Sequence, residues 1–233
     1  MKLTWFGHAC FKVDFGSHKI LIDPFLTGNE KFTESGHTLD EVINGVNYVV
    51  LTHGHDDHVG DTIDICKKTG ATLIATFELA MYLNTQGVEN IDLTNTGGTV
   101  DYKEFKVSFV NALHSSATFV DDKPVYLGPA CGVILTSDQQ KTLYHMGDTD
   151  IFSDMALIHE IYKPDIGLVP IGDRFTMGAK TASLACKKFF NFKTVIPCHY
   201  GTFPIIDQDA SKFIAEMQSE IVLVPKIGQE IEL

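Results

Sequence analysis

The sequence has few basic residues, and Arg174 is the single arginine among its 233 residues. Its 18 lysine and arginine residues stand against 30 aspartate and glutamate residues, which gives a formal net charge of −12. Because affinity for nucleic acid depends mainly on neutralising phosphates with basic side chains, this balance argues against a nucleic-acid partner. Bound cations would neutralise some of these acids, so the field near a metal site is expected to be less negative than the total charge suggests.

The chain also lacks a long apolar run and any closely spaced pair of cysteines. No stretch approaches the roughly 20 apolar residues of a membrane span, and the opening MKLTWFGH has no apolar run of signal-sequence length. The five cysteines are scattered, at positions 10, 66, 131, 186 and 198. We therefore expect free thiols, a cytoplasmic location and no contact with a membrane.

No linker, low-complexity tract or repeat divides the sequence, so we expect one domain over residues 1–233. Apolar patterns predict strands at 3–5, 10–15, 19–22, 48–51, 72–75, 99–102, 105–113, 130–136, 142–145, 166–170, 194–197 and 221–224. Helical spacing appears at 59–69, 77–86, 154–162, 180–190 and 207–218. Residues 26–45 are expected to form an exposed loop. The pattern predicts an α/β protein with two sheets flanked by outer helices.

A dense cluster of histidines and aspartates follows the apolar run 48–51. The segment Thr52–His58 reads THGHDDH and contains the spacing H-x-H-x-D-H. A lone His-x-His is common in surface loops, but three histidines and two aspartates within six residues are hard to explain structurally. Two imidazoles and a carboxylate suit zinc, iron, nickel or manganese. The segment therefore predicts a metal site.

Four further polar residues each follow an expected strand: Asp23, His114, Asp148 and His199. Taken singly, each has an ordinary explanation. His114 is typical of a core or surface histidine, Asp148 of a turn or a helix N-cap, and His199 of a turn. Their order around the histidine string favours one shared site.

The H-x-H-x-D-H motif and these four residues together resemble the sequence pattern of the metallo-β-lactamase superfamily over nearly the whole chain. The resemblance implies a four-layer αββα sandwich, with two mixed sheets flanked by helices and a two-metal centre at one edge. It assigns His53, His55 and His114 to one ion, Asp57, His58 and His199 to the other, and Asp148 to a bridge between them. Asp23 would hydrogen-bond a ligand histidine and fix its orientation.

Three other stretches, residues 5–8, 172–178 and 197–204, resemble metal-dependent hydrolases related to L-ascorbate-6-phosphate lactonase. In the second stretch, Arg174 either clamps a phosphate or carboxylate group or is an ordinary solvated loop residue. Thr176 and Tyr200 are further candidates for substrate contact. Cys198 adjoins His199 but is expected to pack in the interior, because neighbours on a strand point to opposite faces.

The resemblance implies hydrolysis of an ester, lactone or phosphoester bond of a small substrate by a hydroxide that bridges two divalent ions. Zinc is the first expectation, with manganese, nickel or iron as alternatives. Asp57 would orient the nucleophile. His8 is either a proton shuttle at the pocket mouth or a turn histidine.

Three other functions stay open, namely a phosphodiesterase or nuclease, a redox protein with two irons, and a metal-binding protein without turnover. The net charge disfavours a nuclease. A homo-oligomer is expected from analogy with related lactonases.

Overall fold

A computed structural model describes residues 1–233, and these form two compact units. The first unit comprises residues 1–95, 115–130 and 225–233, and the second comprises residues 96–114 and 131–224. Each unit is therefore built from segments that are separated along the chain. The expectation of one domain stays a prediction.

The first unit is built on a seven-stranded mixed sheet in the order β15-β1-β2-β3-β4-β5-β6. Strands β15, β1, β2 and β3 pair in antiparallel fashion, whereas β3, β4, β5 and β6 are parallel neighbours. The strands span Lys2–Trp5 (β1), Phe11–Asp14 (β2), Lys19–Ile22 (β3), Tyr48–Val50 (β4), Thr72–Thr76 (β5), Ile91–Thr94 (β6) and Glu230–Glu232 (β15). The predicted strands up to residue 76 match these bounds closely, while β6 and β15 carry no strong apolar pattern.

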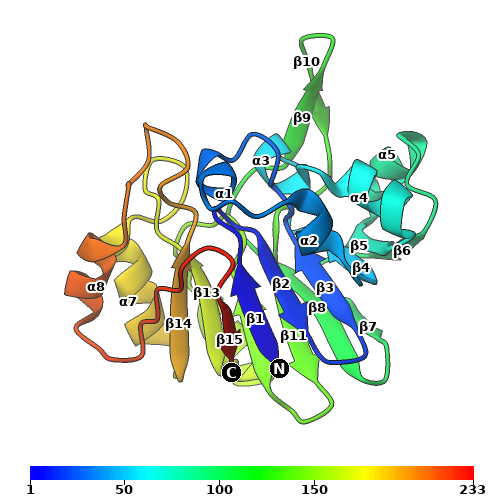
Figure 1. Ribbon diagram of the computed structural model, residues 1–233. Helices are drawn as coiled ribbons and strands as arrows, with labels where there is room; N and C mark the ends of the chain where they lie inside the picture. Colours follow the sequence, from blue (N-terminus) through cyan, green and yellow to red (C-terminus); the bar gives the residue numbers. More distant parts are fainter. The chain divides into compact units, whose positions relative to one another are not determined.

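Helices cover one face of this sheet, and Figure 1 shows α4 and α5 beside its β4–β6 end. Alternate strand residues such as Leu21, Val49 and Leu73 join Ile65 and Leu79 in one buried apolar cluster, as the alternation of side chains along a strand requires. The helices of this unit are α1 (Glu30–Glu34), α2 (Leu39–Ile43), α3 (Asp56–Val59), α4 (Thr62–Thr69) and α5 (Phe77–Thr85).

The expectation of an exposed loop over residues 26–45 is wrong, because two short helices lie there. Asn29 caps α1 by accepting a hydrogen bond from the backbone of Phe32. Thr38 and Glu41 form a reciprocal capping box at the start of α2. Capping hydrogen bonds of this kind satisfy backbone N–H groups at the start of a short helix and so stabilise it. The spacing Thr-x-x-Glu predicts such a cap, whereas the glycines of this segment favour a loop.

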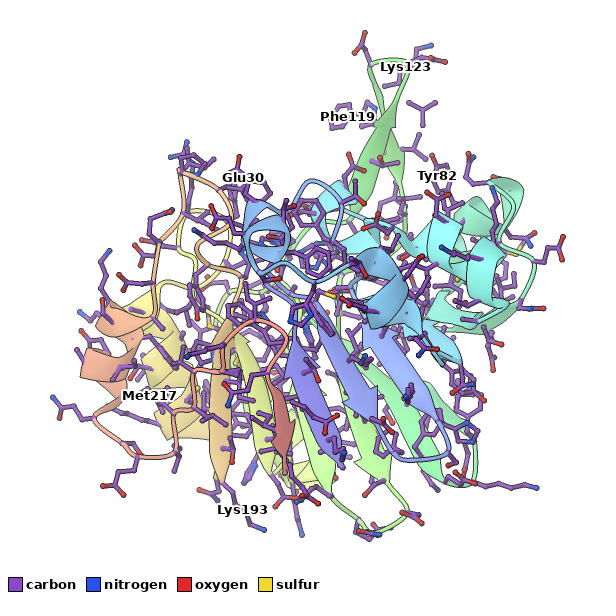
Figure 2. All side chains as sticks on the ribbon, viewed as in Figure 1. Glu30, Tyr82, Phe119, Lys123, Lys193 and Met217 are labelled. Atoms are coloured by element: carbon purple, nitrogen blue, oxygen red, sulfur yellow. The ribbon has the colours of Figure 1, made fainter.

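A separate β-hairpin completes the first unit, with β9 (Ala117–Val120) paired to β10 (Lys123–Tyr126). It stands clear of the seven-stranded sheet (Figure 1). Figure 2 shows Phe119 on its side and Lys123 at its tip. The side chains of Phe119 and Tyr126 are 71% and 70% exposed, so the hairpin contributes little to the apolar core.

The second unit is built on a six-stranded mixed sheet in the order β14-β13-β12-β11-β8-β7. Strands β12, β13 and β14 are parallel, and the other pairs are antiparallel. The strands span Thr99–Asp101 (β7), Phe105–Asn111 (β8), Cys131–Ser137 (β11), Thr142–His145 (β12), Ile166–Pro170 (β13) and Thr194–Cys198 (β14). Residues 221–224, predicted as a strand, form only an isolated bridge between Val222 and Val195.

The helices of the second unit are α6 (Met155–Tyr162), α7 (Ala179–Phe189) and α8 (Ser211–Met217). Just beyond α7, the rings of Phe190 and Phe192 stack with their centroids 4.6 Å apart, and Phe190 also contacts Tyr144. This aromatic group is part of the buried core. Across both units, every helix falls short of the length and apolar character needed to cross a bilayer.

Candidate metal centre

In the first unit, the topology of the sheet brings two parts of the predicted site, Asp23 and the segment Thr52–His58, to the same edge. Asp23 directly follows β3, and the segment Thr52–His58 follows β4. Strands β3 and β4 are parallel neighbours, so their carboxyl ends lie side by side. Ligand sites in α/β sheets occur at such carboxyl ends.

The carboxylate of Asp23 is fully buried and holds this segment in place. Its Oδ1 accepts from the backbone N–H of Thr52 at 2.8 Å, and its Oδ2 accepts from the Thr52 hydroxyl at 2.6 Å. Oδ2 also lies 2.7 Å from Nδ1 of His58. An ionised carboxylate only accepts hydrogen bonds, so Nδ1 of His58 carries the proton and Nε2 offers its lone pair to a cation.

His53 and His55 lie together, with Nε2 of His53 3.0 Å from Nδ1 of His55. The loop that carries them is tightly packed, since a Cβ on Gly54 would come 2.6 Å from a methyl carbon of Leu127. The backbone N–H of Gly54 donates to the hydroxyl of Ser116 at 3.0 Å. A side chain at position 54 would therefore overlap Leu127, so the loop requires glycine between the two histidines.

The two residues predicted to act on the nucleophile and its protons also lie together. Nε2 of His8 is 3.1 Å from Oδ2 of Asp57, and the ligand atoms of His8, Asp57 and His58 all lie within 4.8 Å of one another. His8 is fully buried, whereas the Asp57 side chain is 28% exposed. His8 therefore contacts Asp57 from inside the unit instead of lining an open mouth.

In the second unit, three predicted metal ligands lie close together at the ends of strands that run in the same direction. Asp148 follows β12, His199 directly follows β14, and His114 follows β8. Oδ2 of Asp148 lies 3.1 Å from Nε2 of His199 and 3.6 Å from Nε2 of His114. Asp148 and His199 are buried and His114 is half-buried. One carboxylate oxygen thus faces two imidazoles, which is an arrangement able to bind a cation.

Thr149 ties the two loops that carry these residues, a role that sequence reasoning missed. Its hydroxyl accepts from the backbone N–H of Leu113 at 3.0 Å and donates to the carbonyl of Asp150 at 2.7 Å. The backbone N–H of Asp150 in turn donates to the carbonyl of Leu113. Buried His145 accepts from the backbone N–H of Gly147 through Nδ1. These bonds hold the turn around Asp148 in a fixed position.

The three residues predicted to contact the substrate belong to the second unit. Arg174 is exposed and in the left-handed backbone region, with φ of 52°, and its guanidinium lies over the ring of Phe175. Thr176 is half-buried and donates to the carbonyl of Met177. Tyr200 is buried, and burial raises the pKa of its hydroxyl, which is therefore protonated at neutral pH.

Gly172 allows the backbone before Arg174 to approach His199 closely. A Cβ at this position would overlap the carbonyl oxygen of His199 and lie 3.1 Å from its Nδ1. We expect Gly172→Ala to displace His199, because a backbone oxygen cannot move aside as a side chain can. Metal affinity should fall about 10–100-fold, as when a group that orients a ligand is lost. Titration of the metal-free protein with zinc measures this change.

Gly167→Ala provides a matched control in the same sheet. A Cβ at Gly167 on β13 would come 2.7 Å from the ring of Phe192, so this variant is also overpacked but away from the ligands. It should lower the free energy of unfolding by about 1–3 kcal/mol and leave the affinity for zinc unchanged. Equal metal affinities for the two variants would show that Gly172 does not position His199.

The donors in both units fit a divalent metal of intermediate softness. The predicted ligands are imidazoles and carboxylates, with no thiolate among them, and all five cysteines are buried. This composition suits zinc, manganese, iron and nickel. The hydrogen bond that Nδ1 of His58 donates to Asp23 is the outer support usual for a metal-binding histidine.

Comparison with known proteins gives matches over the full length of the chain. The family described as the beta-lactamase superfamily domain matches residues 2–199. A UPF0173 metal-dependent hydrolase of Chelativorans sp. (strain BNC1) is 56% identical over 237 residues, which cover 100% of each protein.

Two solved structures show the same fold. Igni18, a metallo hydrolase from the archaeon Ignicoccus hospitalis, is 34% identical with a TM-score of 0.86, over 99% of this chain and 97% of that chain. The metallo-β-lactamase fold protein YhfI from Bacillus subtilis, 16% identical, has a TM-score of 0.71 over 99% and 98%. The predicted α/β class, with two mixed sheets flanked by helices in a metallo-β-lactamase-like fold, is confirmed.

Proposed function

Since the chain belongs to the β-lactamase superfamily and is a metal-dependent hydrolase, we propose that it cleaves an ester, lactone or phosphoester bond of a small substrate with two divalent ions. The observation that carries the proposal is the gathering of histidine and aspartate donors at the carboxyl ends of parallel strands in each unit. The proposal of two ions per chain rests on the resemblance to the superfamily.

In this proposal, His53, His55 and His114 hold the first ion, and Asp57, His58 and His199 hold the second. Asp148 would serve both ions, which is supported by the position of its Oδ2 atom near both His114 and His199. Two such ions, when bound, would lower the pKa of bound water toward neutrality and polarise the scissile bond. Zinc is the proposed metal, with manganese, nickel and iron accepted by the same donors.

The chain's own residues supply orientation and proton handling. Asp57 would orient the attacking water and take its proton on a carboxylate oxygen. His8 would hold Asp57 in place through Nε2, which is supported by its complete burial and the 3.1 Å contact. We propose His8 as a positioning residue and not as a shuttle open to solvent.

Substrate binding is assigned to Arg174, Thr176 and Tyr200. Arg174 is the one guanidinium available to pair with a phosphate or carboxylate in two hydrogen bonds. The protonated hydroxyl of Tyr200 is a hydrogen-bond donor. We also propose a cytoplasmic location, which is supported by five buried cysteines that form no disulfide.

One assay series tests this function. The purified protein, loaded with zinc or manganese, is assayed on matched panels of lactones, carboxylic esters and phosphodiesters. We expect turnover of lactones or other esters that is lost with a chelator and restored by metal. Turnover of phosphodiesters alone would replace the lactonase-like proposal with a phosphodiesterase. Metal binding without turnover on any panel would contradict a hydrolase acting on these bonds.

A further inference from the structure

Thr52 stands directly before the first histidine of the string, and its hydroxyl contacts two side chains of the site. The hydroxyl oxygen lies 2.6 Å from Oδ2 of Asp23 and 3.0 Å from Nδ1 of His53. All three residues are fully buried. Bulk water therefore does not compete for these bonds, which makes each more costly to lose.

Hydrogen-bonding chemistry fixes the direction of both contacts. An ionised carboxylate has no proton to donate, so the Thr52 hydroxyl gives its one proton to Asp23. The hydroxyl oxygen can then only accept from His53, and Nδ1 of His53 must carry the proton. The neutral imidazole keeps its lone pair on Nε2, the atom that lies beside His55.

Asp23 acts on the two predicted metals by different routes. It receives Nδ1–H of His58 directly, at 2.7 Å, and it reaches His53 only through the Thr52 hydroxyl. His58 belongs to the proposed second ion and His53 to the proposed first ion. One buried carboxylate thus supports a ligand of each ion, but only one of the two connections passes through Thr52.

We propose that Thr52 is a positioning residue that holds His53 in the Nδ1–H form and so favours binding of the first ion over the second. The inference rests on the proposed function, because it assigns His53 and His58 to different ions. It predicts a selective loss: removing the hydroxyl weakens one ion, whereas changing Asp23 weakens both.

The test compares Thr52→Val with Thr52→Ser. Valine keeps the branched shape and removes the hydroxyl, and serine restores the hydroxyl. Titration of the metal-free proteins with zinc should show one site of Thr52→Val weakened about 10–100-fold, the usual cost of losing an outer support, and the other unchanged. Thr52→Ser should bind both ions as the wild type does.

A second readout does not depend on bound metal. Nitrogen-15 spectra of the histidine side chains in the metal-free protein should show Nδ1 of His53 protonated in the wild type and a mixture of tautomers in Thr52→Val. Thr62→Val is the matched control, because Thr62 is fully buried and its hydroxyl has no hydrogen-bond partner. This variant should match the wild type in both measurements.

The outcomes separate this inference from the proposed function. An unchanged His53 tautomer in Thr52→Val would overturn the inference, and so would equal weakening of both ions. If Thr52→Ser behaved like Thr52→Val, the methyl group and not the hydroxyl would matter, which also overturns it. A wild type that binds fewer than two ions would contradict the proposed function, while the tautomer spectra would still decide the role of Thr52.

Discussion

Asp148→Ala is expected to abolish metal binding and hydrolysis together. Asp148 is the one carboxylate that faces both His114 and His199, and it is the residue proposed to serve both ions. Losing an outer support costs about 10–100-fold in affinity or activity, so loss of a shared ligand should exceed 100-fold. Elemental analysis of the purified variant, together with kcat/KM on the best ester or lactone, measures both effects.

Asp64→Ala is the matched control for this variant. Asp64 is exposed on α4, so its loss removes one negative charge without touching the candidate site. Metal content and kcat/KM should stay at wild-type values. A metal-loaded, active Asp148→Ala protein would contradict the assignment of Asp148 as a shared ligand.

Asp23→Ala is expected to destabilise the protein even when no metal is bound. The change leaves three buried donors without an acceptor: the Thr52 N–H, the Thr52 hydroxyl and Nδ1–H of His58. Each such group costs about 1–3 kcal/mol. Asp23 also has φ of 45°, where alanine costs roughly 1–2 kcal/mol more. Urea denaturation of the metal-free protein should therefore show a loss of about 3 kcal/mol or more.

Asp23→Asn distinguishes the effect of losing the carboxylate from the effect of placing alanine at a positive φ. Asparagine tolerates the left-handed region, but its amide cannot accept all three hydrogen bonds. This variant should be more stable than Asp23→Ala and still bind both ions about 10–100-fold more weakly than the wild type. Asp14→Ala serves as the control, because Asp14 is a half-buried residue at the end of β2 whose carboxylate accepts from the backbone N–H of Gly16. If Asp23→Ala were as stable as Asp14→Ala, the three bonds would not hold the histidine segment.

The sequence was most informative where strands end in polar residues. The sequence correctly predicts that Asp23, the segment Thr52–His58 and Asp148 follow strands, because buried strands have strong apolar runs and polar residues beside these runs are easily recognised. What the pattern could not predict was the direction of each side chain. The contact of His8 with Asp57 joins residues 49 positions apart, and no local spacing encodes it.

Local physical properties explain why the sequence pattern did not predict some secondary-structure elements correctly. Strands β9 and β10 are short and mostly exposed, so they lack the alternation that marks a half-buried strand. Residues 221–224 are apolar enough for a strand, yet only Val222 pairs with β14. The roles of Thr52 and Thr149 cannot be predicted from the sequence, because a threonine hydroxyl gives no signal until its hydrogen-bond partners are known.

The central claim is that this chain holds two divalent ions with the histidines and aspartates at its strand ends. Titration of the metal-free wild-type protein with zinc, followed by calorimetry and elemental analysis, tests it most directly. Two ions per chain are predicted, with binding lost in Asp148→Ala and retained in Asp64→Ala. A single ion per chain, or two ions still bound by Asp148→Ala, would contradict the account.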